Sequence, residues 1–485
     1  MRIYITGLPS GYQVEHLARV FFPGAQLLIE KPAAKDHDDL IRAHYGKKHH
    51  WVALRQNGRV FSRRKKVNAE DPRPDYTLAA LLYYLLKDST RIRPPWGMMT
   101  GVRPVRLIHD ARNAGKSEQE IRTHFIKGFD CTEEKFQLAL GIADLQKPLI
   151  EKHSPRDYSI YIGIPFCPSR CSYCSFVSRT VEKDRSLVQP YVDCLCREIE
   201  KIKEEAEKNA MHLKSIYIGG GTPTSLSAEQ LRQLMGTVRE CFDLDKVEEY
   251  TVEAGRPDCT DEEKLMVLKE YGATRVSINP QTFSDEVLCH IGRRHTAQEI
   301  LDCYQTARRV VHNNINMDLI AGLPGDTVQG FENSLRQAIA LEPENITVHT
   351  LTLKRASNLV IEHTPEDYGN VAAMLEKCKL LAEAGYQPYY MYRQKNTLQN
   401  LENTGWCKPG KEGLYNIYIM EEIHSILAAG AGASTKMCAE PGKKIQRIFN
   451  YKYPGEYISG FDTILKRKEG VTAYYAGNLD SETIG

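Results

Sequence analysis

The chain has 485 residues, a formal net charge of +2 and 13 cysteines. The near-neutral charge argues against bulk electrostatic binding to nucleic acid. Scattered cysteines in an odd number, in so long a chain, exclude a small disulfide scaffold. No apolar stretch reaches the roughly 20 residues of a membrane span, and the first residues lack the apolar core of a signal peptide. We therefore expect a cytoplasmic protein of two or three domains.

The first part of the chain, residues 1–152, is expected to form an α+β domain of unknown role. Strands are predicted at Ile3–Thr6 and Trp51–Leu54, and a strongly apolar helix is predicted at Tyr76–Lys87. The basic run Arg63–Lys66 is interpreted as a solvated loop.

A segment rich in helix and strand breakers, Arg93–Pro104, lies within this first part. Its Trp96 is flanked by prolines and glycines. Such a tryptophan is more often a packed anchor than a ligand contact, so the structural role is favoured.

Three closely spaced cysteines, Cys167, Cys171 and Cys174, carry the strongest chemical signal. Four thiolates normally hold a [4Fe–4S] cluster, so a C-x3-C-x2-C triplet supplies three ligands and leaves one iron open. An open iron can bind amine and carboxylate groups, as it does for S-adenosylmethionine before one electron cleaves the C–S bond. Zinc sites more often pair C-x2-C units or add histidines. A cluster is therefore favoured over an incomplete zinc site or three unrelated thiols.

From the cysteine segment onward, short β-branched runs alternate with helical segments, which is typical of βα units and a parallel sheet. The predicted strands are Ser159–Phe166, Ser215–Ile218, Glu249–Glu253, Arg275–Asn279, Ile315–Ile320 and Asn345–Leu353. Six units are fewer than the eight of a full barrel. We therefore expect an α/β fold over residues 153–360, an open, partial (β/α)6 barrel whose gap would admit a large substrate.

Helix signals lie between these strands. Ser227–Gln230 and Thr260–Glu263 both fit the capping box, and Asp193–Lys208 carries apolar residues spaced for one buried face. The last part of the chain, residues 361–485, is expected to cover the substrate and to include a helix near Glu366–Ala384.

The second predicted barrel strand runs into Gly219, Gly220, Gly221 and Thr222, where three missing side chains let a ligand lie against the backbone. This strip is a candidate to hold the methionine amino group, and a tight turn is the alternative. The next strand ends in Glu253, at the edge where barrel active sites form. A carboxylate there can accept hydrogen bonds from both ribose hydroxyls, and a strand-end salt bridge is the alternative.

Gln281 and Asp318 occupy matching places on the following two strands. Asp318 is flanked by apolar residues, and a buried carboxylate needs partners, which favours a functional role.

Arg293 and Arg294 follow Gln281. Their guanidinium groups match carboxylates in geometry, so they could hold the methionine carboxylate or a substrate carboxylate. A cluster of charges on a helix surface is the competing interpretation.

Taken in order, these motifs resemble the radical S-adenosylmethionine superfamily and, within it, the oxygen-independent coproporphyrinogen III oxidase family. The resemblance covers residues 158–354 strongly and residues 385–434 more loosely. The segment Pro95–Pro104 looks like the HemZ-type coproporphyrinogen dehydrogenase branch. The resemblance implies that the three cysteines bind a [4Fe–4S] cluster. It also implies that S-adenosylmethionine is contacted at the matching positions, which are Tyr161, Gly219, Gly220, Gly221, Thr222, Glu253, Gln281, Arg293 and Asp318.

The same resemblance implies a reaction. A 5′-deoxyadenosyl radical would take a β-hydrogen from a propionate of coproporphyrinogen III, and loss of CO2 and an electron would leave a vinyl group. Two turns would give protoporphyrinogen IX, with a reductant protein such as flavodoxin or ferredoxin as partner. A substrate with several propionates needs fixed cations, and Arg256, Arg293, Arg294 and Lys354 lie at or just beyond strand ends.

Two positions depart from the family pattern. The dehydrogenases carry a further cysteine two residues after the third ligand, where this chain has Phe176. The related haem chaperones carry a His-Asn-x-x-Tyr-Trp segment, and its best counterpart here begins with Tyr415. Three interpretations therefore stay open. Porphyrinogen decarboxylation leads, a haem-binding carrier is second, and another radical reaction on a tetrapyrrole or a different substrate is third.

Overall fold

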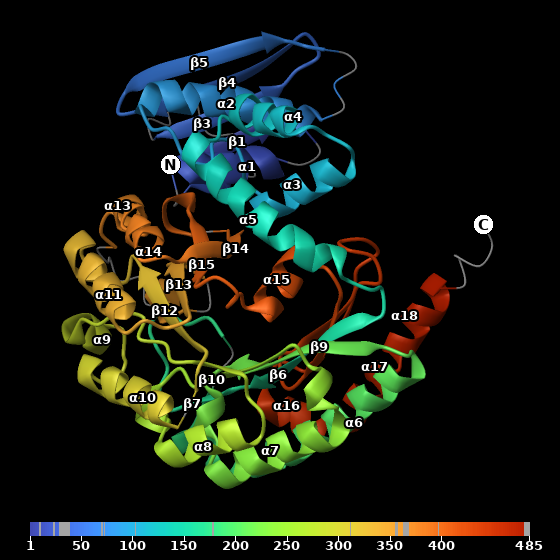
Figure 1. Cartoon of the computed structure of the whole chain (residues 1–485). Helices are drawn as coiled ribbons and strands as arrows, with labels where there is room; N and C mark the ends of the chain where they lie inside the picture. Colours follow the sequence, from blue (N-terminus) through green and yellow to red (C-terminus); the bar gives the residue numbers. More distant parts are fainter. Residues whose placement is uncertain are drawn as a thin grey trace. The chain divides into compact units, whose positions relative to one another are not determined.

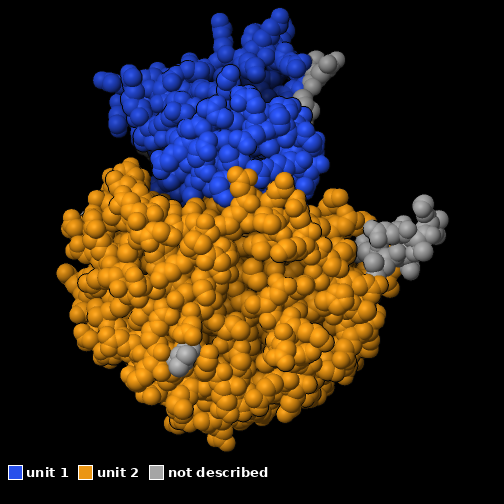
Figure 2. Space-filling model, viewed as in Figure 1, with its two compact units in different colours: residues 1–141, 393–402 blue, residues 142–392, 403–485 orange. Residues whose placement is uncertain are grey.

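The computed structural model of the chain describes residues 1–8, 11–22, 25–28, 39–68, 71, 73–101, 103–176, 179–310, 312–354, 357–361, 368–395 and 397–479. The chain forms two compact units (Figure 2). The first comprises Met1–Gly141 with Arg393–Glu402, and the second comprises Ile142–Tyr392 with Asn403–Gly485. The domain boundaries expected near residues 152 and 360 stay predictions.

The first unit is an α+β fold on a five-stranded sheet in the order β2-β1-β3-β4-β5. Its strands are β1 (Arg2–Thr6), β2 (Gln26–Leu28), β3 (Leu40–Tyr45), β4 (His49–Gln56) and β5 (Arg59–Lys66). Its helices are α1 (Tyr12–Phe21), α2 (Pro74–Thr90), α3 (Pro104–Asn113), α4 (Glu118–Thr123) and the start of α5 (Glu133–Glu151). One apolar core joins α1 and α2 to the strands. The two strands and the helix predicted here are confirmed by β1, β4 and α2.

The loop predicted at Arg63–Lys66 is wrong. These residues form the second half of β5, which pairs with β4 along eight positions at the edge of the sheet. Their side chains are exposed, as the interpretation expected. Charged residues on an edge strand hinder pairing with another chain, which explains why the strand carries no apolar alternation.

Trp96 is a packed anchor of the first unit. Its indole is fully buried and donates a hydrogen bond of 2.7 Å from Nε1 to Glu402 Oε2. Lys135 Nζ lies 2.6 Å from the other carboxylate oxygen, and the Arg393 guanidinium lies 5.3 Å from the centre of the indole ring. A buried carboxylate is stable only with such partners, so this cluster fixes the returning segment Arg393–Glu402 within its own unit.

The second unit contains an 11-stranded sheet in the order β14-β15-β13-β12-β11-β10-β9-β6-β16-β17-β18. Its centre consists of six parallel strands, which are β6 (Asp157–Ile164), β9 (His212–Gly220), β10 (Glu249–Glu253), β11 (Arg275–Ser277), β12 (Ile315–Ala321) and β13 (Asn345–Thr350). Helices lie on the outer side of these strands (Figure 1). The expected open, partial (β/α)6 barrel is confirmed, and all six predicted strands overlap the observed ones.

The sheet extends beyond the six predicted strands at both ends. β15 (Glu402–Cys407) pairs antiparallel with β13, and β14 (Gln387–Arg393) follows it. At the opposite end β16 (Ser425–Ala429) pairs parallel with β6, followed by β17 (Ser434–Met437) and β18 (Gln446–Phe449). β7 (Phe166–Cys167) and β8 (Arg179–Thr180) form a separate two-stranded ribbon.

The helices of the second unit, after the end of α5, are α6 (Val181–Lys208), α7 (Ala228–Cys241), α8 (Glu262–Glu270), α9 (Asp285–His290), α10 (Ala297–Arg309), α11 (Val328–Ala340), α12 (Asn358–Ile361), α13 (Val371–Glu376), α14 (Lys379–Glu383), α15 (Leu414–Glu421), α16 (Pro454–Ser459), α17 (Phe461–Lys468) and α18 (Gly470–Leu479). Among the described residues, no helix is long and apolar enough to cross a membrane.

Two of the local helix predictions are confirmed and two need correction. The capping box at Ser227 is present, and Leu195, Ile199 and Ile202 form a buried face of α6. The cap predicted at Thr260 is wrong by one residue: the Asp261 carboxylate accepts the backbone N–H of Lys264, whereas the Thr260 hydroxyl donates to Thr224.

The single helix predicted over 366–384 is α13 and α14, which are separate. Residues 366 and 367 lie outside the described part of the chain.

Candidate active site

The segment that carries Cys167, Cys171 and Cys174, here called the cysteine loop, follows β6 and lies against the end of β9. The backbone N–H of Gly221 donates to Ile164 O at 2.7 Å, and that of Thr222 donates to Phe166 O at 2.8 Å. A Cβ on Gly221 would lie 2.6 Å from Phe166 O and 2.9 Å from Cys167 Sγ. Only glycine fits so close an approach, so Gly221 is what allows the cysteine loop to pack against the end of β9.

Cys167 ends β7, Cys171 and Cys174 flank the short turn that follows, and the three form no disulfide bond. The backbone N–H of Cys174 donates to Cys171 O at 3.1 Å, and the Thr222 hydroxyl lies 3.6 Å from Cys167 Sγ. In the described part of the chain, no three Cys, His, Asp or Glu side chains converge on a single metal ion. A cubane cluster does not need such convergence, because each cysteine binds a different iron.

The strip of three glycines lies between Cys167 of the cysteine loop and the Glu253 carboxylate. A Cβ on Gly219 would lie 2.8 Å from Glu253 Oε1, and one on Gly220 would lie 3.3 Å from the Tyr161 hydroxyl. Gly220 also has a φ of +110°, which other residues rarely adopt. The floor of the site is therefore bare backbone, with Cys167 at one end and Glu253 at the other.

Glu253 stands at the carboxyl end of β10 in a half-buried position. The Tyr217 hydroxyl donates to its Oε1 at 2.5 Å. Burial raises the pKa of Glu253 to about 7, against the lowering effect of that hydrogen bond, and the nearby Asp318 charge raises it further. The carboxyl is thus poised between its neutral and charged forms near neutral pH.

Gln281 and Asp318 meet through the backbone. Gln281 has a φ of +67°, its N–H donates to Asp318 O, and its carbonyl accepts from Ile320 N–H. The Asp318 carboxylate accepts a hydrogen bond of 2.8 Å from Asn316 and lies 3.7 Å from His349 Nε2. A strained, left-handed residue in a strand extension is a feature of functional sites, and it brings Gln281 to the edge that holds Asp318.

Three tyrosine rings from distant segments stand nearly parallel beside Glu253. The Tyr217 and Tyr415 ring centres lie 4.6 Å apart, and Tyr161 lies 6.3 Å from Tyr217 and 6.5 Å from Tyr415. The interplanar angles are 17° to 22°. Tyr415 comes from α15, far along the chain. The sequence analysis assigned Tyr161 to the site, but it missed Tyr217 and the stacking role of Tyr415.

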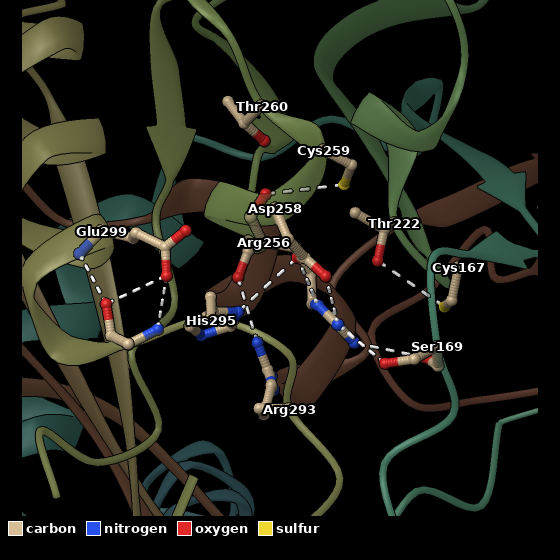
Figure 3. A network of polar contacts seen from close by, with 12 residues as sticks. Cys167, Ser169, Thr222, Arg256, Asp258, Cys259, Thr260, Arg293, His295 and Glu299 are labelled. Atoms are coloured by element: carbon tan, nitrogen blue, oxygen red, sulfur yellow. Dashed lines mark hydrogen bonds and ion pairs between the residues drawn. The ribbon is translucent and has the colours of Figure 1, made fainter. Parts of the chain in front are cut away.

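Arg256 also contacts the cysteine loop, through Ser169 (Figure 3) and Cys171. Its side chain is 5% exposed, and its Nε and Nη2 donate to the two carboxylate oxygens of Asp258 at 3.0 and 2.7 Å. Burial alone would raise the pKa of Asp258, but His295 and Arg256 beside it hold that pKa well below its usual range. Neither Arg256 nor Asp258 was predicted to contact the cysteine loop.

The two arginines predicted as carboxylate ligands separate. Arg293 turns inward, where its Nη2 donates to the Tyr173 hydroxyl at 3.1 Å and its Nη1 lies 3.4 Å from Gly255 O. Its Nε is buried and has no hydrogen-bond partner among the described residues. The Arg294 side chain is 61% exposed and pairs with Glu182 at 3.2 Å. Arg293 can therefore serve the site, whereas Arg294 belongs to the surface.

A family model described as the Radical SAM superfamily matches residues 161–338. The chain is 41% identical over 393 residues to the oxygen-independent coproporphyrinogen-III oxidase-like protein HemZ of Bacillus subtilis, and the match covers 80% of this chain and 78% of that protein. The chain therefore belongs to the radical SAM superfamily and, within it, to the family of oxygen-independent coproporphyrinogen-III oxidase-like proteins. It is also 34% identical over 281 residues to the Heme chaperone HemW of Bacillus subtilis, over 56% of this chain and 70% of that protein.

A solved structure shares the fold. Coproporphyrinogen III oxidase HemN of Escherichia coli, described as a radical SAM enzyme, matches with a TM-score of 0.53. The match covers 66% of this chain and 72% of that chain at 24% identity. At this level of identity the likeness concerns the fold alone.

The cofactors follow from the superfamily. Radical SAM proteins use a [4Fe–4S] cluster and S-adenosylmethionine, and so does this chain. The residues present fit both groups. Three thiols free of disulfide bonds lie within eight residues of the chain, and the glycine strip beside them is a cradle that any Cβ would fill. Which side chains hold each group stays a prediction.

Proposed function

We propose that this radical SAM protein catalyses the oxygen-independent decarboxylation of coproporphyrinogen III to protoporphyrinogen IX, in cytoplasmic haem biosynthesis. The aromatic wall of Tyr161, Tyr217 and Tyr415 carries the proposal. Each pyrrole ring of a porphyrinogen has an aromatic face against which tyrosine rings of this kind can pack. The HemZ relative, whose name contains coproporphyrinogen-III oxidase, supports the same substrate class.

In this proposal Cys167, Cys171 and Cys174 hold the cluster. S-adenosylmethionine lies along the glycine strip, with its contacts from the positions matched in the family. These positions are Tyr161, Gly219, Gly220, Gly221, Thr222, Glu253, Gln281, Arg293 and Asp318. The strip supports this placement because its backbone is open to a ligand between the cysteine loop and Glu253.

When bound, the two cofactors supply a carbon radical that removes one hydrogen atom from a propionate. Each propionate then loses CO2 and one electron and becomes a vinyl group, so the reaction also needs a one-electron acceptor. A reductant protein such as flavodoxin or ferredoxin supplies the electron that starts each turn. The protein's own task is to fix the propionate and to keep water from the radical.

Two cations are suited to hold carboxylates, either that of the methionine or those of the propionates. Among the described residues, the buried Nε of Arg293 has no hydrogen-bond partner. Lys354 is half-buried near Cys174, and burial lowers the pKa of its ammonium group. An anionic ligand would restore the partner that burial denies such a cation. Arg256 and Arg294 are less suited, because the first is engaged by Asp258 and the second by Glu182.

A haem carrier is the second candidate function, and the Heme chaperone relative favours it. The chaperones carry a histidine at the position of Tyr415. In this chain that tyrosine is 5% exposed and is stacked on Tyr217. A side chain committed to a stack inside the site is better suited to shape a substrate pocket than to bind and release haem.

An anaerobic turnover assay separates the two functions. Reconstituted protein is reduced and given S-adenosylmethionine with coproporphyrinogen III, and mass spectrometry follows vinyl products and 5′-deoxyadenosine. We expect 5′-deoxyadenosine to rise in proportion to vinyl groups formed. Stoichiometric haem binding, with no 5′-deoxyadenosine formed in response to any porphyrinogen, would overturn the proposal in favour of the carrier.

A further inference from the structure

The guanidinium group of Arg256 uses all five of its N–H donors inside the protein. Nε and one N–H of Nη2 bind Asp258. The other N–H of Nη2 donates to Ser169 Oγ at 2.8 Å, and Nη1 donates to Ser169 O at 3.2 Å. The remaining N–H of Nη1 lies 3.7 Å from Cys171 Sγ. Arginine has five donors in a rigid plane, so this orientation is fixed by four other contacts.

Neighbouring groups hold this arrangement from both sides. The Ser169 hydroxyl donates to Gly292 O at 3.2 Å while it accepts from Arg256. On the far side, His295 Nδ1 lies 3.5 Å from Asp258 Oδ1, and the His295 side chain is fully buried (Figure 3). A buried arginine with a bidentate carboxylate and a filled donor set has little freedom to turn away.

We propose that Arg256 is a positioning residue for the iron–sulfur cluster, which orients Cys171 and raises the reduction potential of the cluster through its charge and its N–H···S contact. The proposal rests on the assignment of Cys171 as a cluster ligand. It does not depend on which substrate the protein uses. It also gives a role to Arg256, whose N–H groups are all taken by protein partners and so cannot bind a propionate.

The physical basis is the charge change on reduction. One added electron makes the cluster and its thiolates more negative, so a fixed positive charge and an N–H directed at a ligand sulfur stabilise the reduced form more than the oxidised form. Hydrogen bonds to the sulfurs and the local net charge are among the features that set these potentials. Groups just outside the ligands also orient them, which is the role of Ser169 and Asp258 here.

The test is a redox titration of the full-length, anaerobically reconstituted protein, without substrate, followed by electron paramagnetic resonance. The variants are Arg256→Gln and Arg256→Lys. We expect Arg256→Gln to lower the ratio of reduced to oxidised cluster about tenfold at a fixed potential, which is a shift of 59 mV for one electron. Arg256→Lys keeps the charge but not the planar fork, so its shift should be smaller and in the same direction.

Arg232→Gln is the matched control, because it removes the same charge from an exposed arginine that pairs with Glu263. It should leave the potential unchanged. If Arg256→Gln does not fold by circular dichroism, the comparison of Arg256→Lys with the wild type decides. Potentials equal to the wild type at full iron content would overturn the proposal. Iron content reports on the ligand assignment, and vinyl formation reports on the proposed function, so failure of either is seen separately.

Discussion

Two carboxylates lie close together in the sequence, Glu253 at the end of β10 and Asp258 in the turn after it. Their electrostatic surroundings are opposite. Glu253 is half-buried, and its desolvation together with the charge of Asp318 raises its pKa to about 7, against the lowering effect of the Tyr217 hydroxyl. Asp258 faces the Arg256 guanidinium, and its pKa lies well below the usual range. The glycine strip and the cysteine loop lie between these two surroundings. The site therefore has one side whose charge can change near neutral pH and another whose charges are fixed.

The largest expected effect comes from removing the three cysteines that are predicted to bind the cluster. Replacing Cys167, Cys171 and Cys174 together with alanine should remove the cluster absorbance and the iron, because no thiolates remain to bind it. Iron analysis after anaerobic reconstitution measures this. Cys289→Ala, which changes an exposed cysteine, should keep four irons per chain. Four irons in the triple variant would contradict the assignment.

The second prediction concerns the side with fixed charges. Asp258→Asn should lower the free energy of unfolding by about 1.5–3 kcal/mol, the value of hydrogen bonds to a charged group, because the buried Arg256 loses its counter-charge. Urea unfolding followed by circular dichroism measures it. Asp243→Asn, in the exposed ion pair with Lys246, is the control and should have a smaller effect. Equal midpoints for the two variants would contradict the role of Asp258.

The pH dependence of this contribution follows from the direction of the pKa shift. The folded pKa of Asp258 lies below its unfolded value of 3.8. Its contribution to stability is therefore complete above pH 3.8 and is lost as the pH falls toward the folded value. Glu253 behaves in the opposite way. Its contribution is complete below its unfolded value of 4.5 and is lost as the pH rises through about 7.

The third prediction concerns the side whose charge can change. Glu253→Ala should keep the cluster and weaken S-adenosylmethionine binding by about 1–3 kcal/mol, because hydrogen bonds to a charged group are lost. Calorimetry at pH 8 measures the affinity. If the charged carboxylate accepts the ribose hydroxyls, wild-type affinity should fall as the pH drops below about 7, and the variant should lose this dependence. Unchanged affinity in the variant would return Glu253 to a structural role.

Much of this arrangement could be predicted from the sequence. The parallel strands are largely buried, β6 and β10 along nearly their whole length, and therefore appear as short apolar, β-branched runs. The cysteine spacing and the position of Glu253 at a strand end are local features. The strands β17 and β18 were missed because they are short and include polar residues, and β5 was missed because its side chains are largely exposed.

Contacts between distant segments were beyond the sequence. The stack of Tyr217 and Tyr415 joins positions 198 residues apart, the difference of 415 and 217. Arg256 was expected to meet a substrate carboxylate, but its donors are taken by groups that only the fold brings near. A residue type identifies what a side chain can bind, whereas burial and neighbours decide which partner it has.

The smallest expected effect comes from removing the one hydrogen bond that Tyr217 donates to Glu253. The Tyr217 hydroxyl lowers the pKa of Glu253 by donating to the charged form. Tyr217→Phe should therefore raise that pKa and move the pH dependence of S-adenosylmethionine binding upward by less than about one pH unit, or ~1.4 kcal/mol. Calorimetry between pH 6 and 9 measures the midpoint.

Tyr250→Phe is a closely matched control for this measurement. Tyr250 lies on the same strand as Glu253, and its buried hydroxyl has no hydrogen-bond partner among the described residues. Its removal should leave the midpoint in place, because no hydrogen bond to a carboxylate is lost. No shift in Tyr217→Phe, or an equal shift in both variants, would show that burial rather than this hydrogen bond sets the acidity of Glu253. An upward shift in Tyr217→Phe alone would make the tyrosine hydroxyl the group that keeps this carboxylate ionised near neutral pH.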